Sequence, residues 1–343
     1  MATVSVTCNG CDFDPWLFIK NFHSENEAFL DYLKAQGVLP TSVTCPNCEI
    51  QCRYRTDRHQ FVCDQWHNVA KTKRRRRCNY SVSLYKGTFL DKTHLPPWEI
   101  GLFINHWLLK KFDHDTILKC LHWSMRTSID WRSFCSEVTL SWLNDQEPIG
   151  GIDIIVEIDE TFFVKAKYGR GRELRQIWVF GGIERVSKKK FIVPLHKEGQ
   201  DRSARTLIPL IKKYIRPGSI VISDGWAAYN TVGQEGYTHK VINHSEQFVD
   251  TNDPVIHTQT IERAWRDLKE WVKRPGLRTD YFEQYFGRYL FIDSFPNNSH
   301  HHFFLEAGKL YPPHGARERP SGQEDLSESE EPSASASTDT DEA

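Results

Sequence analysis

The sequence has no apolar run that approaches the roughly 18 residues needed to cross a membrane. Its first residues also lack a basic segment followed by an apolar one. We therefore expect no membrane-spanning helix, no membrane partner and no secretory signal. Nine cysteines in a chain without an export signal indicate thiols and metal ligands rather than disulfides. With 343 residues, 39% of them hydrophobic and 13% aromatic, the chain is expected to form two or three globular units.

Lysine and arginine are absent from residues 323–343, which contain eight acidic residues. The chain as a whole carries 44 basic and 45 acidic residues, a net charge of -1, so the part before this tail is positively charged. The tail is too polar to form a core, and we expect residues 313–343 to be disordered. A basic body is typical of proteins that bind polyanions, although a solvated charged surface gives the same totals.

Cysteines recur early in the chain with spacing typical of a zinc ribbon. The letters CPNC at residues 45–48 form a knuckle, and two further cysteines follow. Four thiolates can surround zinc tetrahedrally, so we predict a zinc ribbon over residues 41–92. The favoured ligands are Cys45, Cys48, Cys63 and Cys78. Alternatives are His67 in place of Cys78, with Cys52 as a spare thiol, or a buried thiol cluster without metal.

Residues 1–40 are expected to form a helical segment. Its apolar face would consist of Phe18, Phe22, Phe29 and Leu33. Cys8 and Cys11 precede it as a metal half-site or as ordinary thiols.

Six cations stand among the seven residues 71–77, KTKRRRR, between the last two predicted zinc ligands. Such a run binds phosphate or directs nuclear import, and the alternative is a flexible charged loop. The predicted DNA contacts here are Lys73, Arg74, Arg75, Arg76 and Arg77.

Residues 93–148 have a helical pattern. We expect one amphipathic helix after residue 97, a short second helix over residues 115–121, and a third that Ser124 caps. A short second helix is typical of a helix-turn-helix, in which the third helix lies in the DNA major groove. Arg126 and Arg132 would then contact DNA. The alternative is a plain helical linker.

An apolar strand that ends in acid stands out at residues 152–161, IDIIVEIDET. Four of the five residues 154–158 are Ile or Val, which is typical of a buried strand. We expect the strand to end near Asp159, with Glu157 and Asp159 on one face because strand side chains alternate. Clustered carboxylates beside an apolar layer favour a bound cation. The alternative is a solvated acidic turn.

Strands and helices alternate after residue 149. We expect strands at 175–183, 191–195 and 219–223, and helices at 204–214 and 257–272. If the first and fourth strands are neighbours, Asp159 and Asp224 lie together where open sheets bind ligands. Glu262 on the late helix would add a third carboxylate. This arrangement fits an α/β domain with the ribonuclease H-like fold over residues 149–312, and its chemistry is phosphoryl transfer by two Mg²⁺ ions.

Several ordered motifs resemble the Merlin superfamily of cut-and-paste DNA transposases. They are VEIDETFF, WVFGG, SDGWAAY, NHSEQFVD and HTQTIERAWRDLK, and CPNC together with residues 78–89 resembles that family's zinc ribbon. The resemblance covers about residues 20–310. It implies that Asp159, Asp224 and Glu262 bind Mg²⁺ or Mn²⁺, and that Lys269, seven positions after the third acid, holds a phosphate.

Other residues near these motifs have two interpretations each. The cations after the first acid would grip DNA phosphates or lie on a solvated hairpin; they are Lys165, Lys167, Arg170, Arg172 and Arg175. Trp226 and Tyr229 would stack on an unpaired base or belong to the core. His244 and His257 would orient water or phosphate. Glu157 and Glu160 would support the site rather than bind metal.

The sequence therefore predicts a DNA transposase with a zinc ribbon and a helical DNA-binding region before the catalytic domain. It would bind inverted repeats as a homo-oligomer and, in a eukaryote, act in the nucleus. Two alternatives stay open: a transposase-derived DNA-binding regulator without catalysis, and a nuclease that cuts without strand transfer.

Overall fold

The structure is a computed structural model, and it describes most of the chain. The described residues are 22, 26–68, 74–110, 112–163, 177–195, 199–242, 257–272 and 279–313. Within them, no helix combines the length and the apolar character that crossing a membrane requires.

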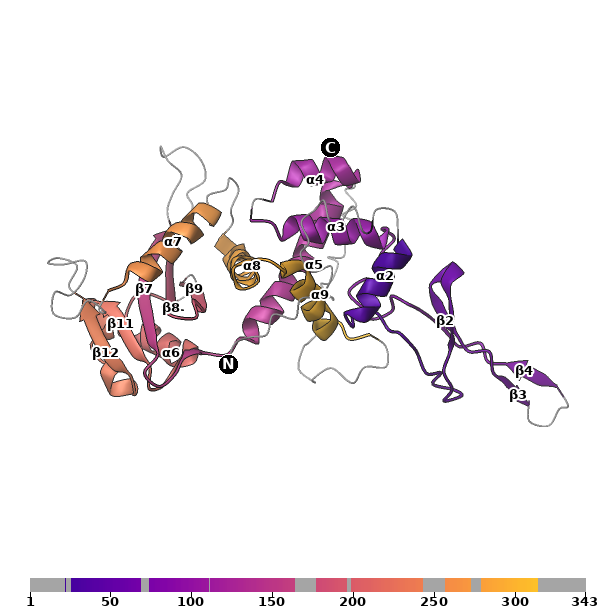
Figure 1. Cartoon of the computed structure of the whole chain (residues 1–343), viewed down its shortest axis with the longest axis horizontal. Helices are drawn as coiled ribbons and strands as arrows, with labels where there is room; N and C mark the ends of the chain where they lie inside the picture. Colours follow the sequence, from indigo (N-terminus) through magenta and orange to yellow (C-terminus); the bar gives the residue numbers. More distant parts are fainter. Residues whose placement is uncertain are drawn as a thin grey trace, which may run out of the picture.

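A mixed five-stranded sheet forms the centre of the second half of the chain (Figure 1). Its strands, in chain order, are β7 Ile155–Phe163, β8 Ile177–Glu184, β9 Lys190–Leu195, β11 Ile220–Asp224 and β12 Thr238–Ile242. The spatial order is β12-β11-β7-β8-β9. β7, β8 and β9 are antiparallel neighbours, whereas β11 runs parallel to both β7 and β12. The first and fourth predicted strands are therefore neighbours, which is the condition under which Asp159 and Asp224 were expected to lie together.

The first strand is longer than the sequence predicted. β7 continues to Phe163 because β8 pairs with it over the whole range from Val156 to Phe163. The expected end of the strand near Asp159 is therefore wrong, as is the alternative of an acidic turn. The acids stand inside a strand, where the neighbouring strands β8 and β11 restrict their access to water.

Two helices cover opposite faces of this sheet. Helix α6, Ala204–Tyr214, has the predicted bounds, and its Leu207 and Ile211 pack in one apolar cluster with Val156 and Ile158 of β7. Helix α7, Gln259–Val272, lies over the other face against β7 and β8. Because alternate residues of β7 point to opposite faces, Glu157 and Asp159 face α7, as predicted.

A helical body lies beside the sheet (Figure 1). Its helices are α2 Asn26–Ala35, α3 Pro97–Trp107, α4 His114–Leu121, α5 Met125–Asn144, α8 Phe282–Ser294 and α9 Ser299–Leu310. The Ser124 hydroxyl accepts the Thr127 amide at 3.0 Å, so the predicted cap of α5 is confirmed. α5 packs along α8 and α9, with Trp142 edge-on to Phe291 at 5.1 Å between ring centroids. Helices α8 and α9 and strand β12 were not predicted.

Short strands make up the cysteine-rich region. β1 Arg53–Arg55, β2 Gln60–Val62 and β5 Ser81–Ser83 form an antiparallel sheet, and β3 Trp66–Asn68 and β4 Arg75–Arg77 form a separate hairpin. Two further short strands pair in parallel: β6 Ile149–Gly150, which precedes β7 in the chain, and β10 Ile215–Arg216, which precedes β11.

Candidate functional site

Two acidic residues meet where β7 separates from β11. The parallel pairing ends with Glu157 opposite Ile222. Two positions further along each strand stand Asp159 and Asp224, so the register puts these two side by side. The carboxylate of Asp224 is close enough to raise the pKa of Asp159.

Asp159 is held in a poorly solvated position. Its carboxylate accepts a hydrogen bond from the indole nitrogen of Trp265 on α7, with 2.9 Å between Nε1 and Oδ2. Burial, together with the charges of Glu160 and Asp224, raises the pKa of Asp159 to about 7, against the opposing effect of the Trp265 bond. A lone anion is disfavoured here, and a cation would compensate it. This is the environment expected of a metal ligand.

Glu157 ties α7 to the sheet. Its carboxylate is fully buried, and its Oε2 accepts hydrogen bonds from the backbone amides of Thr260 and Ile261 at 2.9 and 3.0 Å. Because unpaired amides at a helix N-terminus attract negative charge, this contact fixes the start of α7. The Arg185 side chain donates to Glu157 Oε1 at 2.8 Å and to the carbonyl of His257 at 2.9 Å. Glu157 therefore orients the helix that carries Glu262.

A glycine in β8 makes room for the indole that contacts Asp159. Gly181 pairs with Asp159 in the register of the sheet. A Cβ atom at Gly181 would lie 2.5 Å from Trp265 Cη2 and 2.8 Å from the carbonyl oxygen of Phe191. Sequence reasoning missed this contact, although a Gly-Gly pair inside an apolar strand is a signal of close approach.

Glu160 points to the opposite face and has a different environment. It accepts hydrogen bonds from Tyr229 Oη at 2.7 Å and from Arg202 at 3.3 Å. The Arg202 guanidinium lies over the rings of Trp178 and Trp226, at 4.1 and 4.6 Å from their centroids. Tyr229 has no exposed surface, so of its two interpretations the structure supports the core position rather than stacking on a base. Trp226 is 41% exposed.

The third predicted acid stands on the first turn of α7. Glu262 is exposed, and its Oε1 accepts a hydrogen bond from Thr258 at 3.1 Å. Lys269 is also exposed, seven positions later and thus on the same side of the helix. Among the residues that the structure describes, only a set of four cysteines has three or more ligand atoms all within 4.8 Å. The three acids do not form so compact a group.

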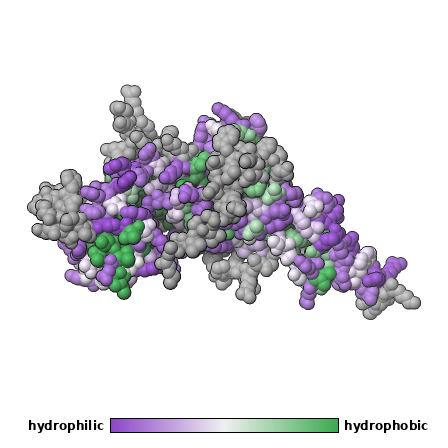
Figure 2. Space-filling model, viewed as in Figure 1, coloured by the Kyte–Doolittle hydropathy of each residue, from purple (hydrophilic) through white to green (hydrophobic). Residues whose placement is uncertain are grey.

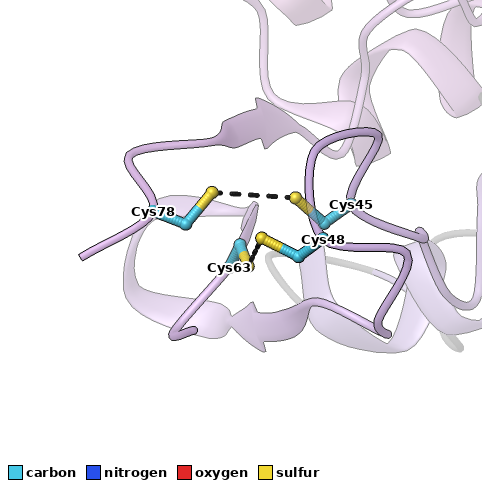
Figure 3. A group of neighbouring side chains, drawn as sticks. All are labelled: Cys45, Cys48, Cys63 and Cys78. Atoms are coloured by element: carbon cyan, nitrogen blue, oxygen red, sulfur yellow. Dashed lines mark hydrogen bonds between the residues drawn. The ribbon is translucent and has the colours of Figure 1, made fainter. Parts of the chain in front are cut away.

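The four cysteines converge on one point (Figure 3). They are Cys45, Cys48, Cys63 and Cys78. The sulfur atoms of Cys45 and Cys78 are 3.8 Å apart, and those of Cys48 and Cys63 are 3.6 Å apart. Zinc bound at 2.3 Å to four tetrahedral thiolates separates them by about 3.8 Å. The donor set therefore fits zinc, and Cys52 lies outside it.

Local hydrogen bonds favour the thiolate of Cys78, whereas the pKa of Cys48 and of Cys63 is raised. The backbone amide of Tyr80 lowers the pKa of Cys78 to about 6. Burial and the neighbouring thiols raise the pKa of Cys48, a cost that a bound cation would remove. His67 Nε2 lies 3.0 Å from Cys48 Sγ but outside the four-sulfur group. The geometry thus favours Cys78 over His67 as the fourth ligand.

The basic residues predicted to contact DNA differ in their ion pairs and in their exposure to solvent. Arg77 pairs with Asp64, which also pairs with Arg53 at 2.6 Å. Arg126 lies 3.5 Å from Asp130 on the exposed start of α5. Arg74, Arg75 and Arg76 are exposed, and Arg132 is half-buried on α5.

Other predicted residues fall outside the described part of the chain. These are Cys8, Cys11, Lys73, Lys165, Lys167, Arg170, Arg172, Arg175 and His244. Their roles stay predictions.

Comparison with known proteins points to one enzyme class. Residues 149–291 match the ISXO2-like transposase domain. An uncharacterized transposase-like protein of Haemophilus influenzae is 28% identical over 81 residues, which is 23% of this chain and 63% of that protein. A chain of a simian T-cell lymphotropic virus intasome in complex with a PP2A regulatory subunit gives a TM-score of 0.27 at 16% identity, over 42% of this chain and 52% of that one. That TM-score is too low to indicate a shared fold. The domain match and the bacterial relative support a transposase of the insertion-sequence type.

Proposed function

We propose that this protein is a DNA transposase that binds inverted repeats, cleaves the DNA at them and joins the freed ends to a target. The observation that carries the proposal is the juxtaposition of Asp159 and Asp224 at the centre of the sheet, inside the region that resembles a transposase domain. We assign the chain to the Merlin superfamily on the motifs of its sequence. A homo-oligomer and, in a eukaryote, a nuclear location are part of the same proposal.

The strand arrangement supports a ribonuclease H-like catalytic domain. Three antiparallel strands are followed in space by two parallel ones, with α6 and α7 on opposite faces. This order brings the ends of strands that are distant in the chain to one edge of the sheet, where ligands bind.

Asp159, Asp224 and Glu262 would hold Mg²⁺ or Mn²⁺, whose chemistry when bound is to activate the attacking oxygen and stabilise the leaving one. Carboxylate oxygens are the ligands these hard cations prefer. Glu262 stands on the first turn of α7, three positions before Trp265, which contacts Asp159, so Glu262 and Trp265 are neighbours on one side of the helix. Lys269, on the same side of α7, would hold a DNA phosphate.

The cysteine cluster would hold a structural zinc ion. Four protein ligands close the coordination shell, so this metal would stabilise the ribbon rather than react. Exposed basic residues beside it, Arg74 and Arg75, would bind DNA.

A second candidate is a DNA-binding regulator that has lost catalysis. It is favoured by the separation of Glu262 from the two aspartates, which leaves the three acids without a compact ligand set. It predicts specific DNA binding without cleavage.

A cleavage and joining assay tests the proposal. The full chain would be incubated with Mg²⁺ or Mn²⁺ and labelled duplexes carrying the candidate inverted repeats, beside Asp224→Asn. We expect metal-dependent nicks and joined products that disappear in the variant. Cleavage without joined products would indicate a nuclease, and specific binding without cleavage in either metal would indicate the regulator.

A further inference from the structure

A β-hairpin is inserted between the third and fourth cysteines of the cluster. It consists of β3 and β4, with Trp66 opposite Arg77, His67 opposite Arg76 and Asn68 opposite Arg75. Both strands are anchored at the cluster. The Cys63 amide donates to the Tyr80 carbonyl at 3.0 Å, and the Cys78 amide donates to the Gln65 carbonyl at 2.7 Å. Zinc at the cysteines would therefore hold the base of the hairpin.

The hairpin projects away from the rest of the molecule. It forms one extreme of the long axis, far from the five-stranded sheet (Figure 1). The surface over this arm is mainly hydrophilic (Figure 2). All six residues of β3 and β4 are exposed, so the two strands cover no core of the protein.

The two faces of the hairpin are chemically different. Side chains that stand opposite one another share a face, and neighbours along a strand alternate. His67 and Arg76 share the face turned toward the cluster, because His67 Nε2 lies 3.0 Å from Cys48 Sγ. Arg76 there lines a hollow beside the cysteines together with His67 and Tyr80, and Arg77, at the base of β4, also borders it.

The outward face carries the remaining side chains of the hairpin: Trp66, Asn68, Arg75 and Arg77. Arg77 is neutralised by its ion pair with Asp64. No ion pair of Arg75 occurs within the described part of the chain. Trp66 is 50% exposed. An arginine, an asparagine and an open indole thus lie together on a face whose neighbouring acid, Asp64, is already paired with Arg77 and Arg53.

We propose that this outward face is a β-ribbon that enters the major groove of duplex DNA. The major groove is about 12 Å wide and admits two strands, which lie about 4.8 Å apart. Arginine and asparagine are the side chains that form paired hydrogen bonds to guanine and adenine there. Arg75 and Asn68 are directly opposite one another, so they would reach neighbouring bases. Trp66, nearer the cluster, packs against the sugar-phosphate backbone.

This inference rests on the proposed function for its substrate, DNA, but not on catalysis. It also narrows the sequence prediction for the arginine run. Of the arginines in β4, Arg75 is assigned to DNA contact, Arg76 to the face beside the cysteines and Arg77 to the pair with Asp64.

Binding of the full, zinc-loaded chain to a fluorescent duplex with the candidate inverted repeat tests the assignment. Arg75→Gln should weaken binding about ten-fold and Asn68→Ala about five-fold, with the loss greater on the inverted repeat than on a scrambled duplex. Arg76→Gln is the matched control, since it removes the same charge from the adjacent residue on the other face. It should weaken binding less than about two-fold. Zinc content measured for each variant separates loss of contact from loss of the ribbon.

Equal losses of affinity for Arg75→Gln and Arg76→Gln would overturn the proposal, because they would show that the hairpin attracts DNA by its charge alone and not through one defined face. An unchanged affinity for Arg75→Gln, or equal competition by single-stranded DNA, would overturn it as well. If Arg75→Gln binds the duplex with unchanged affinity while the native chain cleaves DNA, the β-ribbon proposal is refuted and the transposase proposal stands. If binding depends on Arg75 but the native chain never cleaves, the β-ribbon proposal stands and the transposase proposal is refuted.

Discussion

Replacing Glu157 by glutamine should destabilise the sheet domain through a single buried carboxylate. In the native chain this group, with no exposed surface, compensates the Arg185 guanidinium and two amides of α7. Glutamine keeps one acceptor oxygen and turns an amide donor toward the other donors. Loss of one partner from a buried ion pair costs about 3–5 kcal/mol, so we expect urea unfolding to show a loss of about 3 kcal/mol. Hydrogen exchange should quicken most at the amides of Thr260 and Ile261.

An exposed pair provides the control. Glu235 lies 2.7 Å from Lys212, and both side chains contact solvent, so Glu235→Gln should change stability by less than about 0.5 kcal/mol. Adding Arg185→Met to Glu157→Gln should restore part of the loss, because it removes the uncompensated charge. A Glu157→Gln chain within about 1 kcal/mol of the native chain, with unchanged exchange at α7, would refute the argument.

Three further outcomes follow from the structure. Because the pKa of Asp159 is raised to about 7, the folded chain keeps a proton that the unfolded chain loses near pH 4. Stability in urea should therefore fall from pH 4 to 7 in the native chain but not in Asp159→Asn, and parallel profiles would contradict this. Cys63→Ser should abolish zinc binding in a chromophoric chelator assay, whereas the exposed Cys120→Ser should retain it; equal zinc contents would exclude the cluster. Gly181→Ala should lower the free energy of unfolding by about 2–3 kcal/mol through overpacking. Gly233→Ala should lower it little, because an added Cβ atom there would lie 3.9 Å from its nearest neighbour. Similar losses for the two variants would show that the sheet adjusts to the extra methyl group at Gly181.

Local patterns predicted the elements whose cause is local. The bounds of α6 and the Ser124 cap of α5 follow from apolar spacing and a side chain beside its own helix. The full length of β7 could not be read from residues 154–158, because its second half is held by pairing with β8. The α8 and α9 helices pack on α5 from the far end of the chain. Every residue of α8 from Phe286 to Ile292 is buried, so this stretch lacks the one-sided apolar pattern that marks a surface helix.

The candidate site divides in the same way. Alternation along a strand was enough to place Glu157 and Asp159 on one face, and the strand order then brought Asp224 beside Asp159. The partners were not predictable, since Arg185 lies 28 positions from Glu157 and Trp265 lies 106 positions from Asp159. Such contacts depend on how the chain crosses the sheet, which no local pattern encodes.

The two carboxylates of β7 that face α7 differ in how their charge is compensated. Glu157 is compensated within the protein by a guanidinium and two amides, so it has little to gain from a metal ion. Asp159 accepts hydrogen bonds from the Trp265 indole and the Glu160 backbone but has two acidic neighbours and no paired cation in the described part of the chain, so its charge is left poorly compensated. Because the free energy that a cation gains at a site grows with the charge left unbalanced there, the metal should bind at Asp159 rather than Glu157. Metal-induced stabilisation should accordingly rise between pH 6 and 8, as the Asp159 proton is lost, and should disappear in Asp159→Asn.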